Sequence, residues 1–173
     1  MVVRNVHERE LACAATRAGA LIDTLASRDD RLWPHDRWPA MRLDRPLQVG
    51  AAGGHGPVRY VVEAYEPGRR VRFRFTGPRG FHGWHEFAVH ASSGGCRLVH
   101  VLEMNARGPA RISWPVVYRP LHDALVEDAL DRAERILTGE EATSRWSLYV
   151  RMLRWSLAAM LARRNPRRPR YEE

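Results

Sequence analysis

The sequence contains no lysine, since all 28 of its lysine-plus-arginine residues are arginine. Lysine forms the Schiff bases of aldolases and pyridoxal-phosphate enzymes, and it binds phosphate in Walker-type loops. The chain therefore cannot perform either chemistry with a residue of its own. Gly50, Gly53, Gly54 and Gly56 lack the spacing of the dinucleotide fingerprint, and no strand-then-helix pattern surrounds them. We expect no nucleotide and no other cofactor.

Cysteines and long apolar runs are also scarce. Cys13 and Cys96 lie in unrelated segments without Cys-x-x-Cys spacing. This argues against a disulfide framework or a zinc site and is typical of a reducing compartment. No window reaches the roughly 18 uninterrupted apolar residues that a membrane span needs. Residues 1–8 have no apolar run typical of a signal peptide. We therefore expect a cytoplasmic protein.

Most of the chain also lacks excess positive charge. The net charge is +8, but residues 142–173 hold eight arginines and two glutamates, whereas residues 1–141 hold 20 arginines and 18 acidic residues. The nearly neutral body argues against nucleic acid as a partner. A chain of 173 residues is long enough for one domain with a substantial core.

Apolar periodicity predicts two helices in the first 140 residues. A weakly alternating strand at residues 3–11 precedes a helix over residues 14–26. A longer helix spans about residues 115–137, with proline at its start and Gly139 after its end. The apolar stripes are Ala18, Leu21, Ile22 and Leu25 in the first helix and Tyr118, Leu121, His122, Leu125, Ala129, Ala133 and Ile136 in the second.

The segment between the first helix and the middle of the chain has weaker signals. Two prolines make residues 29–39 irregular, because each disfavours helix in the residue before it. Residues 41–49 are expected to contain a short strand. The glycines of residues 50–57 predict a flexible turn.

Two antiparallel hairpins are the clearest feature. The first joins residues 58–65 to residues 71–76 through a Pro-Gly turn. The second joins residues 85–90 to residues 97–105, and its register places both His85 and His100 on the apolar side. The expected pairs are Phe73 with Ala64, Phe75 with Val62, Arg74 with Glu63, Phe87 with His100, and His85 with Leu102.

Four stretches of this sequence resemble the START-like (SRPBCC) superfamily, specifically bacterial polyketide cyclase/dehydrase and lipid-transport-like proteins. They are residues 60–75, 83–89 and 98–104 and the helix after Gly108, and the resemblance covers about residues 3–138. It implies an α+β helix-grip fold, in which a curved antiparallel sheet wraps around a long C-terminal helix. It also implies an internal cavity for a small hydrophobic molecule, and it supplies no universal catalytic residue.

The alternation of side chains in the strands and the apolar stripe of the long helix predict which residues form the wall of that cavity. A register slip of one residue would turn every strand side chain away from it. We expect Trp33, His35 and Trp38, in the loop after the first helix, at the cavity mouth. The expected ligand-binding residues are Tyr60, Val62, Phe73, Phe75, His85, Phe87, His100, Leu102, Tyr118, His122 and Leu125.

His85, His100 and His122 are the candidates for chemistry. Each could donate one hydrogen bond in the pocket wall, orient a ligand, or act as a general acid or base, and together they could bind a metal, which is the least favoured alternative because zinc sites need closed, convergent ligand sets. Because Glu63, Glu86 and Glu103 fall on the outer face, no carboxylate pair faces the interior, and we expect no bound metal. The sequence thus predicts a carrier or sensor of a lipid-like or polyketide-like molecule, with a cyclase or dehydratase as the alternative.

The C-terminal segment differs in composition from the rest. We expect the helix-grip domain to occupy residues 1–138, an appended basic amphipathic helix residues 139–164, and a disordered tail residues 165–173. Two alternatives stay open for the helical part, about residues 143–164: it packs on this domain or a second copy, or it lies on an anionic membrane as the core of a membrane-docked interaction module. Its expected inner face is Trp146, Val150, Leu153, Leu157 and Leu161, with Leu148 and Trp155 on the far side.

Overall fold

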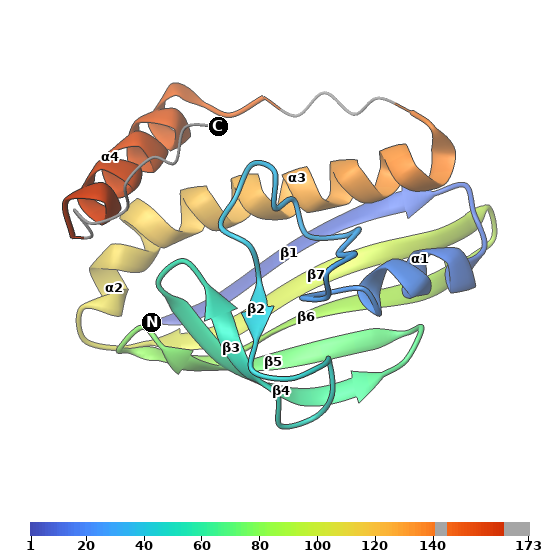
Figure 1. The fold of residues 1–173 in the computed structure, drawn as a ribbon, viewed down its shortest axis with the longest axis horizontal. Helices are drawn as coiled ribbons and strands as arrows, with labels where there is room; N and C mark the ends of the chain where they lie inside the picture. Colours follow the sequence, from blue (N-terminus) through green and yellow to red (C-terminus); the bar gives the residue numbers. More distant parts are fainter. Residues whose placement is uncertain (141–144, 165–173) are drawn as a thin grey trace, which may run out of the picture.

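The computed structural model describes residues 1–140 and 145–164, with side chains up to residue 157. Seven antiparallel strands form one open sheet in the order β1-β7-β6-β5-β4-β3-β2, and the long helix α3 lies across it (Figure 1). This is the α+β helix-grip architecture that the sequence predicts. The elements are β1 (Val2–Leu11), α1 (Ala15–Ile22), β2 (Arg42–Leu43), β3 (Ala52–His55), β4 (Val58–Glu66), β5 (Arg70–Gly77), β6 (Phe81–Ser92), β7 (Gly95–Ala106), α2 (Ala110–Ser113), the π-helical turn η1 (Trp114–Tyr118), α3 (Arg119–Thr138) and α4 (Leu148–Arg164).

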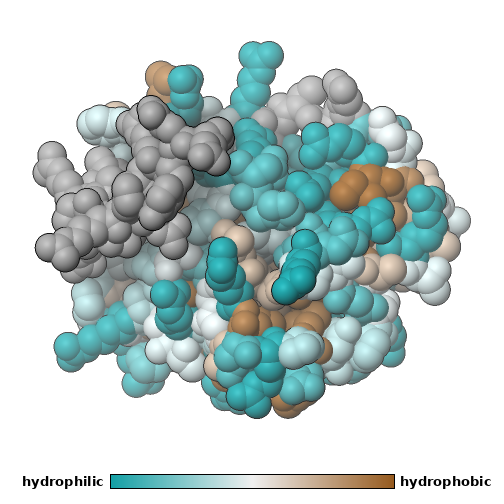
Figure 2. All heavy atoms as spheres, in the orientation of Figure 1, coloured by the Kyte–Doolittle hydropathy of each residue, from teal (hydrophilic) through white to brown (hydrophobic). Residues whose placement is uncertain are grey.

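Alternation in the central strands separates an apolar face from a charged one. In β5, Val71, Phe73 and Phe75 are buried, whereas Arg72 bonds Glu86 of β6 at 2.8 Å on the opposite face. Such outer ion pairs recur across the sheet, and the visible surface of the molecule is mainly hydrophilic (Figure 2). The apolar face is therefore the one that packs against the helices.

The predicted register of the β4–β5 hairpin is wrong by two residues. Phe75 lies opposite Tyr60 and Phe73 opposite Val62, because the turn is one residue tighter than expected and a β-bulge at Glu63 adds a second shift. A shift of two keeps Phe73 and Phe75 on the apolar face. The expected ion pair between Arg74 and Glu63 still forms, since the two side chains are diagonal neighbours on the outer face.

The β6–β7 hairpin has the predicted register, with Phe87 opposite His100 and His85 opposite Leu102. The first strand, β1, pairs with the other edge of β7 and places His7 directly opposite His100. Opposite residues in an antiparallel pair project to the same face. His7 therefore lies on the same side of the sheet as the cavity-facing histidines.

The segment from residue 41 to residue 57 corrects two expectations. The expected strand shrinks to Arg42–Leu43, and the expected flexible turn contains β3, which pairs with both β2 and β4. Its glycines allow close strand contact rather than a turn. A Cβ atom on Gly53 would lie 1.9 Å from the Arg42 carbonyl oxygen, so only glycine fits.

The long helix begins earlier than expected, at Ala110, and passes through the π-helical turn before α3. Pro120 lacks the N–H that would bond the Val116 carbonyl one turn earlier. The Tyr149 hydroxyl donates to that carbonyl at 2.6 Å instead. The proline thus leaves an acceptor to which the C-terminal segment attaches.

Helix α4 runs over one end of α3 (Figure 1). In the part of the chain that the structure describes, no helix is long and apolar enough to cross a membrane. Val150 is buried, while Leu148 and Trp155 are exposed, as the apolar stripe predicts. The expected helix start at Thr143, the Leu161 side chain and the expected disordered tail lie outside what the structure describes.

Candidate ligand-binding site

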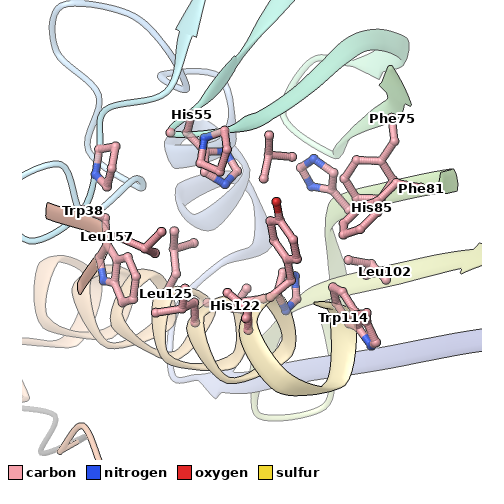
Figure 3. A pocket seen from close by; sticks show the side chains of 18 of the residues that line it. Trp38, His55, Phe75, Phe81, His85, Leu102, Trp114, His122, Leu125 and Leu157 are labelled. Carbon is pink, nitrogen blue, oxygen red and sulfur yellow. The ribbon is translucent and has the colours of Figure 1, made fainter. Parts of the chain in front are cut away.

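A cavity of about 270 Å³ lies between the sheet and α3. Figure 3 shows His55, Phe75 and His85 projecting from the sheet toward His122, Leu125 and Trp114 of the helical side. Its wall is almost entirely carbon, broken by a few ring nitrogens and a phenol. The lining residues are Trp33, Trp38, Pro39, His55, Gly56, Pro57, Val58, Phe75, Phe81, His85, His100, Leu102, Trp114, Val117, Tyr118, Leu121, His122, Leu125, Val126, Arg154 and Leu157.

The structure separates the residues expected in the cavity wall into two groups. Phe75, His85, His100, Leu102, Tyr118, His122 and Leu125 line the cavity. Tyr60, Val62, Phe73 and Phe87 face the same side but lie buried in the packed core, and they do not line it. Helix α1 packs against β5, β6 and β7 and fills one end of the groove. The alternation of side chains along a strand decides which face each one occupies. It does not decide how far along the groove the cavity extends.

The loop between α1 and β2 supplies part of the mouth. Trp33 and Trp38 line the cavity. His35 does not, because it is exposed and its backbone N–H turns back to the Trp33 carbonyl at 2.8 Å. The Trp33 ring lies 4.6 Å from the ring of His55 on β3, so this loop and the sheet edge close on each other.

Several lining residues are missing from the sequence-based set. Phe81 and Trp114 were overlooked because β6 and the long helix both begin earlier than their patterns indicate. His55 was hidden in a segment whose glycines predict a turn. Arg154 and Leu157 belong to α4, and no sequence signal places that helix over the cavity.

His85 and His100 form a hydrogen-bonded pair in the wall. His100 Nε2 lies 3.3 Å from His85 Nδ1, and the His85 ring stacks between the rings of Phe73 and Phe75 at 5.0 and 5.1 Å. His85 Nε2 and His100 Nδ1 have no partner among the described residues. Because each neutral imidazole carries one N–H, the pair keeps one unused donor and one unused acceptor in either tautomer.

Burial keeps these histidines neutral. Loss of solvation lowers the pKa of His85 and of His100 well below 6.5, and neighbouring histidines lower both further. The same effect lowers the pKa of His55 to about 3. Burial also lowers the pKa of His122, although the adjacent Asp123 partly opposes this. These four histidines therefore offer hydrogen bonds without formal charge, and Arg154 is the charged residue of the lining.

Asp128 of α3 joins the mouth of the cavity to the C-terminal segment. It is 3% exposed, and it accepts hydrogen bonds from the indoles of Trp38 at 2.6 Å and Trp146 at 2.9 Å. Arg37 bonds its other oxygen at 2.6 Å. The Arg154 guanidinium lies over both indole rings, 4.2 and 3.9 Å from their centres. Helix α4 is thus attached to the domain at the cavity mouth.

This fold and cavity define a helix-grip protein with an internal apolar cavity. The sequence profile of the family described as polyketide cyclase / dehydrase and lipid transport matches residues 6–138, and the chain belongs to that family. The match ends at the last residue of α3. No curated protein matches the sequence.

Solved structures share the fold at low sequence identity. The di-domain ARO/CYC StfQ from the steffimycin biosynthetic pathway is 13% identical with a TM-score of 0.61, over 80% of this chain and 51% of that one. A Thalictrum norcoclaurine synthase point mutant is 13% identical with a TM-score of 0.59, over 82% and 98%. CalU16 from Micromonospora echinospora is 14% identical with a TM-score of 0.54, over 92% and 86%.

Proposed function

We propose that the protein binds a compact, largely apolar molecule that carries one or two polar groups, as a carrier or sensor. The observation that carries this proposal is the apolar cavity with unused histidine nitrogens in its wall. An unsatisfied buried donor or acceptor costs about 1–3 kcal/mol, and a ligand carbonyl or hydroxyl would recover it. The polar group is expected to lie toward His85 and His100.

The volume of the cavity favours a ring compound over a long-chain lipid. About 270 Å³ is just below the roughly 300–1,000 Å³ usual for small-molecule pockets. The aromatic side chains around it, including Phe75, Phe81 and Trp114, offer edge-to-face contacts to a flat ligand. A polyketide-like aromatic ketone or phenol meets both conditions.

The test uses 2-acetylnaphthalene as a probe, with native mass spectrometry of the full chain to detect any co-purifying ligand. Trp33, Trp38 and Trp114 line the cavity, so binding is expected to quench tryptophan fluorescence in a saturable manner. Leu125→Trp should fill the cavity and abolish the quenching. Val49→Trp, at an exposed position, should preserve it. Equal quenching in both variants would contradict binding in this cavity.

A cyclase or dehydratase is the second candidate function, favoured by the same unpartnered histidine nitrogens. Acid–base catalysis is most efficient when the pKa lies near the working pH, and burial moves the pKa of His85 and His100 away from it. This favours binding over catalysis. His85→Phe separates the two functions: a carrier loses at most the roughly 1–3 kcal/mol of probe affinity that one hydrogen bond supplies, whereas an enzyme loses turnover by orders of magnitude.

We further propose that the outer face of α4 contacts an anionic membrane. Leu148, Met152 and Trp155 project from it with 78%, 60% and 74% of their surfaces exposed, and the exposed Arg151 lies on the same helix. Tyr149 of the same helix bonds the Val116 carbonyl of η1, and Ile112 of α2, which precedes η1 in the chain, is 73% exposed. Exposed tryptophan and leucine beside arginine are typical of an interfacial helix.

Vesicle sedimentation tests this contact. The full chain is expected to sediment with phosphatidylglycerol vesicles at low salt and less at high salt, because each arginine near an anionic surface contributes ~1 kcal/mol. Trp155→Glu should remain in the supernatant, and Val49→Glu, an exposed apolar position elsewhere, should not change sedimentation. A dimer that Trp155→Glu disrupts, without vesicle binding, would assign this face to self-association instead.

A further inference from the structure

A second cluster of chemically active side chains lies where β1 meets α3. His7 projects from β1, and His122 and Asp123 are consecutive residues of α3. One ligand atom from each of the three lies within 4.8 Å of the other two. All three residues are partly buried, and only His122 also lines the cavity.

Two of the three spacings between these atoms are close to those of a tetrahedral metal site, and the ligand atoms of the two histidines lie within 4.8 Å of each other. Asp123 Oδ1 lies 3.2 Å from His7 Nε2 and 3.6 Å from His122 Nδ1. Ligand atoms about 2.0–2.2 Å from a zinc ion, at tetrahedral angles, lie about 3.3–3.6 Å from one another. The three side chains could therefore hold an ion with only small movements and leave the fourth position to water.

Neighbouring groups already orient two of the three side chains. His7 Nδ1 lies 2.6 Å from Glu127 Oε1, which directs the opposite ring nitrogen toward Asp123. Metal-binding histidines in proteins usually donate their other N–H to a carboxylate in this way. Asn5 Nδ2 donates to Asp123 Oδ1 at 2.9 Å, which holds that carboxylate in place.

His122 provides an independent indication. Both of its ring nitrogens are buried and lack a hydrogen-bond partner in the described part of the chain. Its closest charged neighbour is the Asp123 carboxylate at 3.6 Å, beyond ordinary hydrogen-bond length. His7, by contrast, has a carboxylate next to each ring nitrogen. Protonation would therefore satisfy both nitrogens of His7, but it would leave those of His122 without a partner. A metal ion on Nδ1 would satisfy the His122 nitrogen that faces the carboxylate.

We propose that His7, His122 and Asp123 bind one divalent transition-metal ion, and that zinc fits this donor set best. Two imidazoles and one carboxylate suit zinc, whereas magnesium and calcium prefer oxygen ligands alone. The expectation of no metal considered the inner faces of the two hairpins and His122 of the long helix, and it did not include His7 of β1. A metal on Nδ1 would also fix Nε2–H as a donor in His122, a residue of the cavity wall. The evidence for this metal site does not rest on the proposed ligand, although His122 belongs to both the metal site and the cavity wall.

The experiment titrates the full chain, stripped with a chelator, with zinc chloride in a calorimeter. One zinc per chain is expected, together with a higher Tm, and magnesium chloride should give neither. His7→Gln and Asp123→Asn should lose the stoichiometric zinc, and Glu127→Gln should bind about 10–100-fold more weakly. His82→Gln is the matched control, since His82 is an exposed histidine of β6, and it should behave like the unaltered chain.

Two results would overturn the proposal. One is the absence of stoichiometric zinc on the unaltered chain. The other is zinc that survives His7→Gln and Asp123→Asn but is lost in Cys13→Ser, because the Cys13 and Cys96 sulfurs lie 3.8 Å apart and form the competing thiol site. If either variant fails to fold by circular dichroism, NMR of the unaltered chain decides: zinc must shift the ring signals of His7 and His122 and leave those of His82 unchanged.

Discussion

At the scale of single residues, the cavity depends on histidines that burial keeps neutral. His55, His85 and His100 occupy positions where an apolar ring would pack equally well, as the stacking of His85 between two phenylalanines shows. The unused nitrogens of His85 and His100 are a cost to the folded state. Such a cost is consistent with a role in binding, since a purely structural core would be more stable with phenylalanine.

The first prediction concerns acid stability. Because the folded-state pKa of His85 lies well below 6.5, the unfolded chain binds more protons as the pH falls through 6.5. The unfolding free energy therefore falls as the pH is lowered from 6.5 toward the folded-state pKa of His85. The loss is about 1.4 kcal/mol for each pH unit. His85→Phe is expected to reduce the loss of unfolding free energy between pH 6.5 and pH 5 by about 2 kcal/mol in urea titrations.

The control for this prediction is His90→Phe, on the exposed face of β6. It should leave the pH dependence as it is in the unaltered chain. His7 has a raised pKa and contributes in the opposite direction, but it is present in every variant and cancels in the comparison. An unchanged slope in His85→Phe would mean that His85 is solvated or charged in the folded protein.

At the scale of elements, Asp128 connects α3 with the mouth loop and with the segment before α4. It is the common acceptor for Arg37, Trp38 and Trp146. The sequence gives no indication of this role. Asp128 lies outside the apolar stripe of the long helix, and aspartates at such positions are usually solvated. Its importance comes from three donors that converge from other parts of the chain.

The second prediction is that Asp128→Ala destabilises the fold and opens the mouth. Hydrogen bonds to a charged group contribute about 1.5–3 kcal/mol, so a loss of about 3 kcal/mol in the unfolding free energy is expected, with faster hydrogen exchange at the Trp38 and Trp146 indoles. The exposed pair of Asp36 and Arg132 is the control. Asp36→Asn should cost less than about 1 kcal/mol. A similar cost for both substitutions would contradict the role of Asp128.

At the scale of the whole molecule, the sheet and α3 form a core to which α4 adds little. Among the residues whose side chains the structure describes, Val150 is the one buried hydrophobic residue that α4 contributes to the core. It does contribute Arg154 and Leu157 to the cavity wall. The C-terminal segment thus affects the cavity more than it affects the core.

The third prediction follows from this division. A chain that ends at Gly139 is expected to unfold cooperatively, with a Tm lowered by several degrees, and to bind the aromatic probe with a faster off-rate because one side of the mouth is missing. Circular dichroism and stopped-flow fluorescence measure the two effects. A truncated chain without a cooperative transition would show that α4 belongs to the core of the domain.

The sequence by itself determined the faces of the elements. Strict alternation places Phe75, His85 and Leu102 on the inner face, and the 3.6-residue period places His122 and Leu125 opposite them, because these periods follow from backbone geometry alone. Even the wrong register of the first hairpin left these faces intact, since the turn and the bulge at Glu63 together shift it by two residues.

The tertiary structure alone decided which inward residues reach the cavity and which distant ones join it. Phe73 and Phe87 became core because α1 covers their end of the groove, and His7 approached Asp123 because β1 pairs with the far edge of β7. Arg154 reached the cavity because the Asp128 carboxylate and the Val116 carbonyl accept hydrogen bonds from Trp146 and Tyr149, in the segment around α4. These outcomes depend on contacts between residues far apart in the chain, and local periodicity carries no information about such distances.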